Sequence, residues 1–315
     1  MFRRRGSPAS DGARRVWSRV IAIGDVHGDM NALQVCLRIA GVIDGNGDWA
    51  AEPRTLLMSC GDILDRGDED WRCLKYLTGL RRAARLQSSD VACVLGNHEV
   101  LNVCGDTRYV TPKAALSVLE DLYDVNAEGW ADTVEERQWT ARIDAFRPGG
   151  AGARLLADLC DGSPVARLVD GTLFCHGGLH VAALHMASNA TSSADALRQL
   201  NDEASAWLLG RVPPPPVLRA SASSPVWSRS FSHPAGCELS ARNCASALRI
   251  LDALGCERMV VGHTPQIATG INGACDDRIF RIDTGCSAYY GGPKEVLELR
   301  PGKIPVVLSS TVRFS

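Results

Sequence analysis

Short runs of apolar, often β-branched residues recur along the chain, and each closes on a glycine or small residue beside a polar one. Six of these runs have the length of a strand, at residues 19–25, 54–62, 91–97, 171–178, 258–264 and 278–285. Between them, apolar residues recur at helical spacing over residues 29–40, 69–86 and 241–254. Strands alternating with helices predict an α/β fold whose polar residues gather at the strand ends.

Two stretches interrupt this alternation. Residues 113–160 have a mostly helical pattern and predict an insertion at about 105–165 that forms a lid or cap. Residues 211–228 are rich in proline and serine, and should form a loop without regular structure. Because we find no internal repeat and no interdomain linker, we expect a single domain over residues 19–315, preceded by a basic, disordered tail at 1–18.

The overall composition narrows the range of partners. The chain has 315 residues, of which 45% are hydrophobic, and a net charge of -2, which suits one domain with a full core. This balance gives no general attraction to nucleic acid or membranes, and no apolar run approaches the length of a membrane span. We therefore expect neither as a partner and favour a monomer. A cytoplasmic location is our prediction, with organellar targeting by the basic N-terminus as the open alternative.

The twelve cysteines contain no C-x-x-C pair, and most lie in apolar surroundings. Such scattered spacing argues against a zinc ribbon and against a secreted disulfide framework, so we expect buried, reduced thiols. The stretch CGDILDR (60–66) also has the C-x5-R spacing of Cys-based tyrosine phosphatases. We reject that interpretation because Asp62 and Asp65 would repel the phosphate.

Polar residues of a few chemical types follow the predicted strands. They are Asp25, His27, Asp62, Asp65, Asn97, His98, His176, His263 and Asp283. Four of the seven histidines of the chain fall in this set, and random scatter would not place them there. A single such residue is usually a core histidine or a capping aspartate. Several together would leave uncompensated charge, which a divalent metal resolves, and oxygen and nitrogen ligands without thiolate fit Mn, Fe or Zn.

Five motifs in a fixed order carry a family resemblance. They are GDVHG (24–28), GDILDRG (61–67), GNHE (96–99), HGG (176–178) and GHT (262–264). In this order they resemble the motifs of the phosphoprotein phosphatase branch of the calcineurin-like metallophosphoesterases. GNHEVLNVCGDTRYVT (96–111) and DTGCSAYYGG (283–292) are most similar to the Shewanella-like phosphatases. The resemblance spans about residues 21–285 and implies the four-layer αββα sandwich of the metallophosphoesterases.

The resemblance also implies that six of these residues hold two divalent metal ions per chain. One metal would be bound by Asp25, His27 and His263, the second by Asn97 and His176, and both by Asp62. Manganese is the ion we favour, with iron or zinc as alternatives. Asn97 and His98 are neighbours on what we expect to be an extended segment, so their side chains should point in different directions.

By the same resemblance, the reaction is the hydrolysis of phosphomonoesters by a hydroxide that bridges the two metals. His98 would protonate the leaving oxygen as general acid, and Asp65 would orient its ring. Arg66 would bind phosphate oxygens with its planar fork. Arg229 and Arg108 compete as the second phosphate-binding arginine, and we favour Arg229. The implied substrate is a phosphoprotein, with phosphoserine and phosphothreonine expected and phosphotyrosine left open.

Two other functions stay in competition. A hydrolase of bis-nucleoside polyphosphates, such as diadenosine tetraphosphate, is one, because DTGC (283–286) resembles the ending of the bacterial enzymes of that class. The motif GDTRYV (105–110) and the longer helical segment favour the phosphoprotein branch instead. The other is an inactive scaffold that binds phosphoproteins, which the intact set of ligands and acid disfavours.

Overall fold

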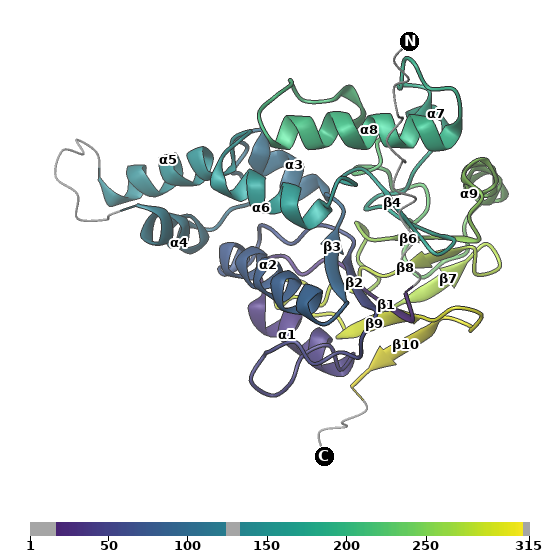
Figure 1. Ribbon diagram of the computed structural model, residues 1–315, viewed down its shortest axis with the longest axis horizontal. Coiled ribbons are helices and arrows are strands. Elements are labelled where there is room, and N and C mark those ends of the chain that lie inside the picture. The colour runs from purple at the N-terminus through teal and green to yellow at the C-terminus, as the bar shows by residue number, and fades with distance from the viewer. Residues whose placement is uncertain (1–16, 124–132, 311–315) are drawn as a thin grey trace, which may run out of the picture.

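The computed structural model describes residues 17–123 and 133–310, so most of the expected tail at 1–18 lies outside the described residues. Its strands form two five-stranded sheets (Figure 1). The first sheet has the order β10-β9-β1-β2-β3 and consists of Arg19–Ile23 (β1), Thr55–Ser59 (β2), Asp90–Cys93 (β3), Glu295–Leu299 (β9) and Val306–Ser309 (β10). The second has the order β4-β5-β6-β8-β7 and consists of Arg167–Val169 (β4), Thr172–Phe174 (β5), Arg258–Val261 (β6), Asn272–Ala274 (β7) and Ile279–Arg281 (β8).

Each sheet has a parallel part built from three of the six predicted strands. These are β1, β2 and β3 in the first sheet and β5, β6 and β8 in the second. All six predicted strands are thereby confirmed. The strands that the sequence did not predict are β4, β7, β9 and β10, and each of them pairs antiparallel with its neighbours.

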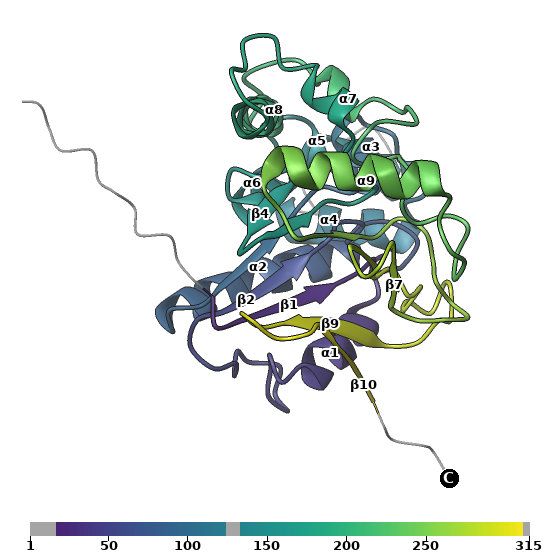
Figure 2. The same cartoon turned by 90° about the vertical axis from the view of Figure 1, so that its right-hand side faces the viewer.

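Helices cover the outer faces of both sheets (Figure 2). The first sheet is covered by Met30–Ile39 (α1), Asp70–Leu86 (α2) and Ala151–Cys160 (α6). The second is covered by Ala241–Leu254 (α9), against which Val181–Leu184 (α7) and Ser193–Leu208 (α8) pack. In Figure 2, α9 and α1 lie on opposite sides of the strands, which is the predicted αββα arrangement.

The alternation of side chains along the strands divides the core. Leu56 and Met58 of β2 pack between the sheets, in one cluster with Val260 of β6 and Phe280 of β8. Leu57, which lies between them in the sequence, belongs instead to the cluster that contains the apolar faces of α1 and α2. Successive side chains of a strand point to opposite faces, so a sheet covered on both faces needs a continuous apolar run.

Local capping explains where two of the predicted helices begin and where one of them ends. Asp29 accepts a hydrogen bond from the Ala32 backbone N–H at 2.8 Å at the start of α1. Ser240 does the same for Asn243 at the start of α9, which ends at Gly255 in the left-handed conformation. These are the side chains and the glycine that helix ends prefer. The three predicted helices are confirmed.

The remaining helices lie between the third and fourth predicted strands. Asn97–Val103 (α3) is followed by Pro112–Leu122 (α4) and Val134–Phe146 (α5), which pack side by side and project from the body of the molecule (Figure 1). Residues 211–228 form a loop as expected, except for one turn of 3-10 helix at Pro216–Leu218. Among the residues that the structure describes, no helix is both long and apolar enough to cross a membrane.

One pair of cysteines corrects the expectation of reduced thiols. Cys244 and Cys275 form a disulfide, with their Cα atoms 5.5 Å apart, which joins α9 to the turn between β7 and β8. The other ten cysteines are free. The two partners are 31 residues apart in sequence, and only the packing of α9 beside this turn brings them together.

The packing between the sheets leads to a stability prediction. Replacing the fully buried Leu56 with alanine should lower the free energy of unfolding by about 2–5 kcal/mol, because the cavity is left inside the intersheet core. Leu86, at the end of α2, is 89% exposed, so L86A should change stability by no more than about 0.5 kcal/mol. Urea denaturation of both variants measures the difference, and equal midpoints would contradict this position of the core.

Candidate active site

The loops that follow the parallel strands of both sheets meet around one cavity of about 340 Å³. Its lining combines imidazoles, carboxylates, guanidinium groups and aromatic rings. The lining residues are His27, Asp62, Arg66, Asn97, His98, Tyr109, Trp227, Arg229, His263, Pro265, Asp283 and Tyr290. Four of the five motifs contribute to this lining, and His176 of the fifth contacts Asp62 from behind it, at 3.2 Å. The motifs therefore come together in space, as the polar residues at the strand ends predicted.

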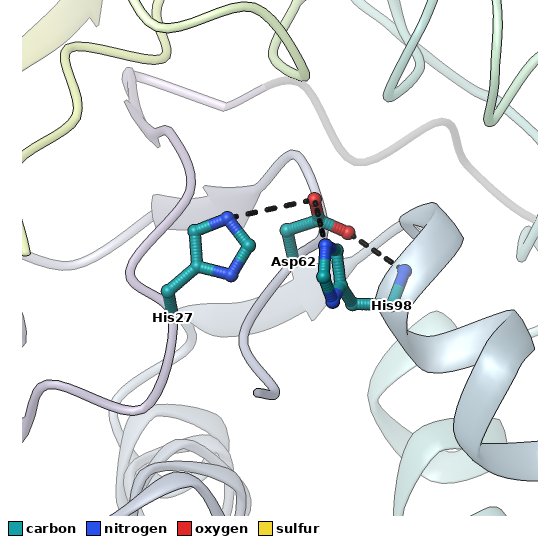
Figure 3. A group of neighbouring side chains, drawn as sticks. All are labelled: His27, Asp62 and His98. Carbon is teal, nitrogen blue, oxygen red and sulfur yellow. Dashed lines mark hydrogen bonds and ion pairs between the residues drawn. The ribbon is translucent and has the colours of Figure 1, made fainter. Parts of the chain in front are cut away.

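The carboxylate of Asp62 lies at the centre of this group. Its Oδ2 atom is 3.7 Å from Nε2 of His27, 4.0 Å from Nε2 of His98 and 3.2 Å from Nε2 of His176. Figure 3 shows the first two imidazoles directed at the same oxygen of the carboxylate, with their ring centroids 4.8 Å apart. The other oxygen, Oδ1, accepts the backbone N–H of His98 at 3.0 Å. Asp62 is 2% exposed, so this negative charge is held almost entirely by protein groups.

A second group adjoins the first. Nε2 of His176 lies 3.1 Å from Oδ1 of Asn97 and 3.2 Å from Nδ1 of His263. Oδ2 of Asp25 accepts the backbone N–H of His263 at 3.0 Å. The other oxygen of Asp25, Oδ1, is buried and has no hydrogen-bond partner among the described residues. All six residues predicted to bind metal thus lie together, at the carboxyl ends of strands from both sheets.

The two tightest spaces at these carboxylates are kept open by glycines. A Cβ atom at Gly96 would overlap Oδ1 of Asp62, and one at Gly262 would overlap Oδ1 of Asp25. Neither glycine has a positive φ, so the missing side chain, and not an unusual backbone, is what the site requires at these two positions. The carboxylate of Asp62 is therefore in contact with backbone on one side and faces the cavity on the other, whereas Asp25 is buried and is not among the lining residues.

The histidines are arranged to present a lone pair to the centre. Nδ1 of His27 lies 3.1 Å from the carbonyl oxygen of Leu64, and Nδ1 of His176 lies 2.8 Å from that of Cys60. A carbonyl can only accept, so each Nδ1 carries the proton and each Nε2 is free to bind a cation. Burial lowers the pKa of His27 to about 4 and that of His263 to about 3, which favours neutral, metal-binding imidazoles.

The buried carboxylates of this site require a positive charge close to them. Burial, together with the neighbouring Asp283 and Asp62, raises the pKa of Asp25 well above its usual value. Burial also raises the pKa of Asp283 to about 6. The unpaired oxygen of Asp25, the free imidazole nitrogens and the absence of thiolate from this set fit divalent cations, because such ions bind these donors and offset the buried charge.

Beside the metal-binding group lies a pair with the geometry of an acid and its orienting base. Nδ1 of His98 is 2.6 Å from Oδ2 of Asp65, which leaves Nε2 facing the cavity. Burial opposes protonation of His98, but the carboxylates of Asp62 and Asp65 outweigh it and raise the pKa of this imidazole. The side chain can therefore carry a proton to a group bound in the cavity.

The structure separates the three candidate arginines. Arg66 and Arg229 both line the cavity, whereas Arg108 is not among the lining residues. The side chain of Arg108 is 65% exposed and pairs with Asp106 at 2.7 Å. The guanidinium carbon of Arg66 lies 4.0 Å from the ring centroid of Tyr109, a cation–π contact that holds its fork over the cavity.

Several of the site residues have an unusual backbone conformation. Positive φ angles of 44° to 71° occur at His27, Asp62, Asp65, Arg66 and His263. Each left-handed non-glycine residue costs on the order of 1–3 kcal/mol, and persists only where its surroundings fix it. Four of these side chains line the cavity, and the fifth, that of Asp65, contacts His98.

Glu99 holds the backbone of two of the loops that carry site residues. Its Oε2 accepts the backbone N–H groups of Asp62 at 2.8 Å and Gly96 at 2.7 Å. Its Oε1 accepts those of Ile63 at 2.9 Å and Leu64 at 3.1 Å. The carboxylate thus ties the start of α3 to the loop that carries Asp62 and Asp65. These contacts give Glu99 a structural role in the site.

The structure also corrects one local expectation and adds Tyr109, which the sequence did not identify as a site residue. Asn97 and His98 are the first residues of α3, not part of an extended segment, although their side chains still diverge. Tyr109 and Tyr290 line the cavity beside His98 and His27, at ring-centroid distances of 5.1 and 5.4 Å. Both tyrosines lie in the stretches 96–111 and 283–292 that carry the family resemblance, but only the packing of these loops places their rings in the lining.

Comparisons with known proteins agree with this geometry. The model of the calcineurin-like phosphoesterase family matches residues 18–266. The chain is 34% identical to Shewanella-like protein phosphatase 2 of Arabidopsis thaliana, over 90% of this chain and 75% of the relative. It is 29% identical to Shewanella-like protein phosphatase 1 of Plasmodium berghei, over 87% of this chain and 69% of the relative.

Two solved structures share the fold. A cold-active protein-tyrosine phosphatase from a psychrophilic Shewanella species superposes with a TM-score of 0.63 at 22% identity, covering 93% of this chain and 81% of that one. A protein serine/threonine phosphatase from Saccharomyces cerevisiae gives a TM-score of 0.56 at 15% identity, covering 96% and 82%. At these identities the likeness establishes the architecture alone.

The contacts of Glu99 predict a large effect from a small change. In E99Q a single carbonyl oxygen must replace two carboxylate oxygens, and the new amide N–H₂ faces backbone donors. Two of the four donors lose their acceptor, at about 1–3 kcal/mol for each. We therefore expect a clear fall in the urea midpoint. Glu135 is exposed, so E135Q should leave the midpoint unchanged, and the prediction is wrong if the two variants behave alike.

Proposed function

The chain belongs to the calcineurin-like phosphoesterase family, and within it to the Shewanella-like protein phosphatases, and on this basis we propose that it is a metal-dependent hydrolase that removes phosphate from phosphoproteins. The observation that carries the proposal is that a proton-donating His98–Asp65 pair and two arginines face the same cavity as the Asp62-centred imidazole group. A phosphomonoester needs each of these parts: charge stabilisation, an anchor for its oxygens and an acid for the leaving group.

We assign the metal sites by the positions of the donors. Family membership implies divalent metal ions, and the histidine and aspartate groups of the cavity fit them. In our proposal one ion is held by Asp25, His27 and His263, the second by Asn97 and His176, and both by Asp62. When bound, these ions supply Lewis acidity that withdraws charge from the phosphoryl oxygens and makes water more acidic. Manganese is the ion that we propose.

His98 acts as the general acid in this proposal. The carboxylate of Asp65 accepts a hydrogen bond from the Nδ1–H group of His98 and fixes the plane of the ring. The proton on Nε2 is then directed into the cavity, where it passes to the leaving oxygen as the phosphorus–oxygen bond breaks. A serine or threonine alkoxide is a poor leaving group, so this proton transfer matters most for such substrates.

The arginines bind the phosphoryl group. Nη1 of Arg229 donates to the carbonyl oxygen of His263 at 2.7 Å and to Oγ1 of Thr264 at 2.9 Å, which fixes this guanidinium at the rim of the cavity. Arg66 enters from the other sheet, and its Nε has no hydrogen-bond partner among the described residues. Both guanidinium groups thus retain donors for phosphate oxygens.

We propose phosphoserine and phosphothreonine as substrates and include phosphotyrosine, because the rings of Tyr109, Trp227 and Tyr290 wall the cavity and suit an aromatic leaving group. The test compares phosphate release from phosphoserine, phosphothreonine and phosphotyrosine peptides with cleavage of diadenosine tetraphosphate, at equal manganese. We expect a phosphopeptide to be hydrolysed fastest. H98N should keep its metal and lose turnover about 10²- to 10⁴-fold.

Two results would argue against this function. Faster cleavage of diadenosine tetraphosphate than of every phosphopeptide would identify a polyphosphate hydrolase instead. Full activity of H98N would show that His98 is not the general acid and that the His98–Asp65 pair does not donate the proton to the leaving group.

The central carboxylate leads to a prediction that needs no activity assay. D62N removes the negative charge that faces His27 and His176, so we expect the bound manganese to fall from two ions per chain to one or none. Elemental analysis after equilibrium dialysis measures this ratio. Asp106 pairs with Arg108 outside the lining of the cavity, and D106N should therefore bind the same amount as the unmodified protein. An unchanged ratio in D62N would refute the bridging role.

A further inference from the structure

We propose that Arg142, on the projecting helix α5, is a positioning residue for the catalytic acid, and that it acts through Asn102 and Asp65 on His98. This inference rests on the proposed role of His98 as general acid. It connects the projecting helices to the proton-transfer step through an unbroken series of buried hydrogen bonds. The sequence gives no sign of this connection, because its members come from three separate segments of the chain.

The series begins with a fully buried ion pair. Both side chains, Arg142 and Asp70 at the start of α2, are 0% exposed. Nη1 of Arg142 donates to Oδ1 of Asp70 at 2.9 Å, and Nη2 donates to Oδ2 at 2.7 Å. The guanidinium carbon also lies 4.1 Å from the ring centroid of Phe146, so one face of the fork is covered as well. This bidentate geometry allows the guanidinium little freedom.

Asn102 of α3 carries the contact from the arginine to the catalytic pair. Its Oδ1 accepts Nε of Arg142 at 3.0 Å and Nη2 at 2.8 Å. Its Nδ2 donates to Oδ1 of Asp65 at 2.8 Å and to the carbonyl oxygen of His98 at 2.9 Å. Arginine can only donate and a carboxylate can only accept, so the orientation of this amide is fixed by its neighbours. An amide is the group that can join a cation to an anion in this way.

Asp65 is consequently held from every side. Oδ1 is bound by Asn102, Oδ2 is bound by Nδ1 of His98 at 2.6 Å, and its own backbone N–H donates to Oδ2 of Asp70 at 3.0 Å. The plane of the Asp65 carboxylate sets the plane of the imidazole. Arg142 therefore fixes Asp65 twice: its carboxylate through Asn102, and its backbone N–H through Asp70.

Catalysis explains this buried hydrogen-bond network better than stability does. A buried ion pair is weak evidence for stability, because an apolar pair of similar volume often serves as well. A catalytic group, in contrast, must be held within a few tenths of an ångström, and a misplacement of about 1 Å can reduce the rate about 10²-fold. The network meets that demand for the proton on Nε2 of His98.

The test uses two substrates that differ in their need for an acid. Phenyl phosphate has a leaving group that requires protonation, whereas 2,4-dinitrophenyl phosphate does not. In N102L and R142K, loaded with manganese, we expect kcat for phenyl phosphate to fall about tenfold to a hundredfold. For 2,4-dinitrophenyl phosphate it should change less than threefold, about the scatter of such assays. If N102L does not fold, as judged by circular dichroism, R142K decides the question because it keeps the charge.

The control is a second buried arginine, whose ion pairs do not include any member of the network around Asp65. Arg81 of α2 is 2% exposed and pairs with Asp90, Asp158 and Asp161, so R81K breaks a comparable buried ion pair. It should lower stability without changing the ratio of the two rates. Equal losses on both substrates in R142K, or the same ratio as in R81K, would overturn the inference. If H98N loses kcat equally on both substrates, relative to the unmodified protein, then the proposed role of His98 as general acid is wrong, and the test says nothing against Arg142.

Discussion

Asp62 keeps a negative charge where water is almost excluded, and the surrounding chain is built around the energetic cost of that charge. Three imidazoles approach one of its oxygens, and a backbone N–H binds the other. The carboxylate stays ionised because His176 and His98 lower its pKa against the effect of burial. His98 and the two arginines, Arg66 and Arg229, line the same cavity as this carboxylate.

The fold surrounds this charge by bringing together the carboxyl ends of the parallel strands of both sheets. Each sheet supplies part of the donor set, so neither sheet would form the site alone. The loops that follow the strands take left-handed conformations at five site residues, and Glu99 holds two of these loops together through four backbone N–H groups. The rigid layers therefore position the site, and the strained loops direct its side chains.

Much of the fold followed from the sequence because the buried parallel strands are long apolar runs that end in recognisable polar residues. Of the antiparallel strands that were missed, β4 and β7 have only three residues each, and β9 is interrupted by glutamates. β10 contains an apolar run, Val306–Leu308, but no glycine with a polar neighbour follows it. We predicted an extended conformation for Asn97 and His98 because Gly96, at the N-cap of α3, has no capping side chain that would indicate a helix start. The cap is provided instead by the side chain of Glu99. The link from Arg142 to Asp65 could not be predicted, since it depends on how α5 packs against α2 and α3.

Gly96 and Gly262 show that a position can be decisive while contributing no functional group. Each leaves room for a carboxylate that any side chain would displace. A survey of substitutions that looks only for lost acids, bases or ligands would therefore overlook them. In this site, tolerance to mutation is set as much by the volume that must stay empty as by the groups that must be present.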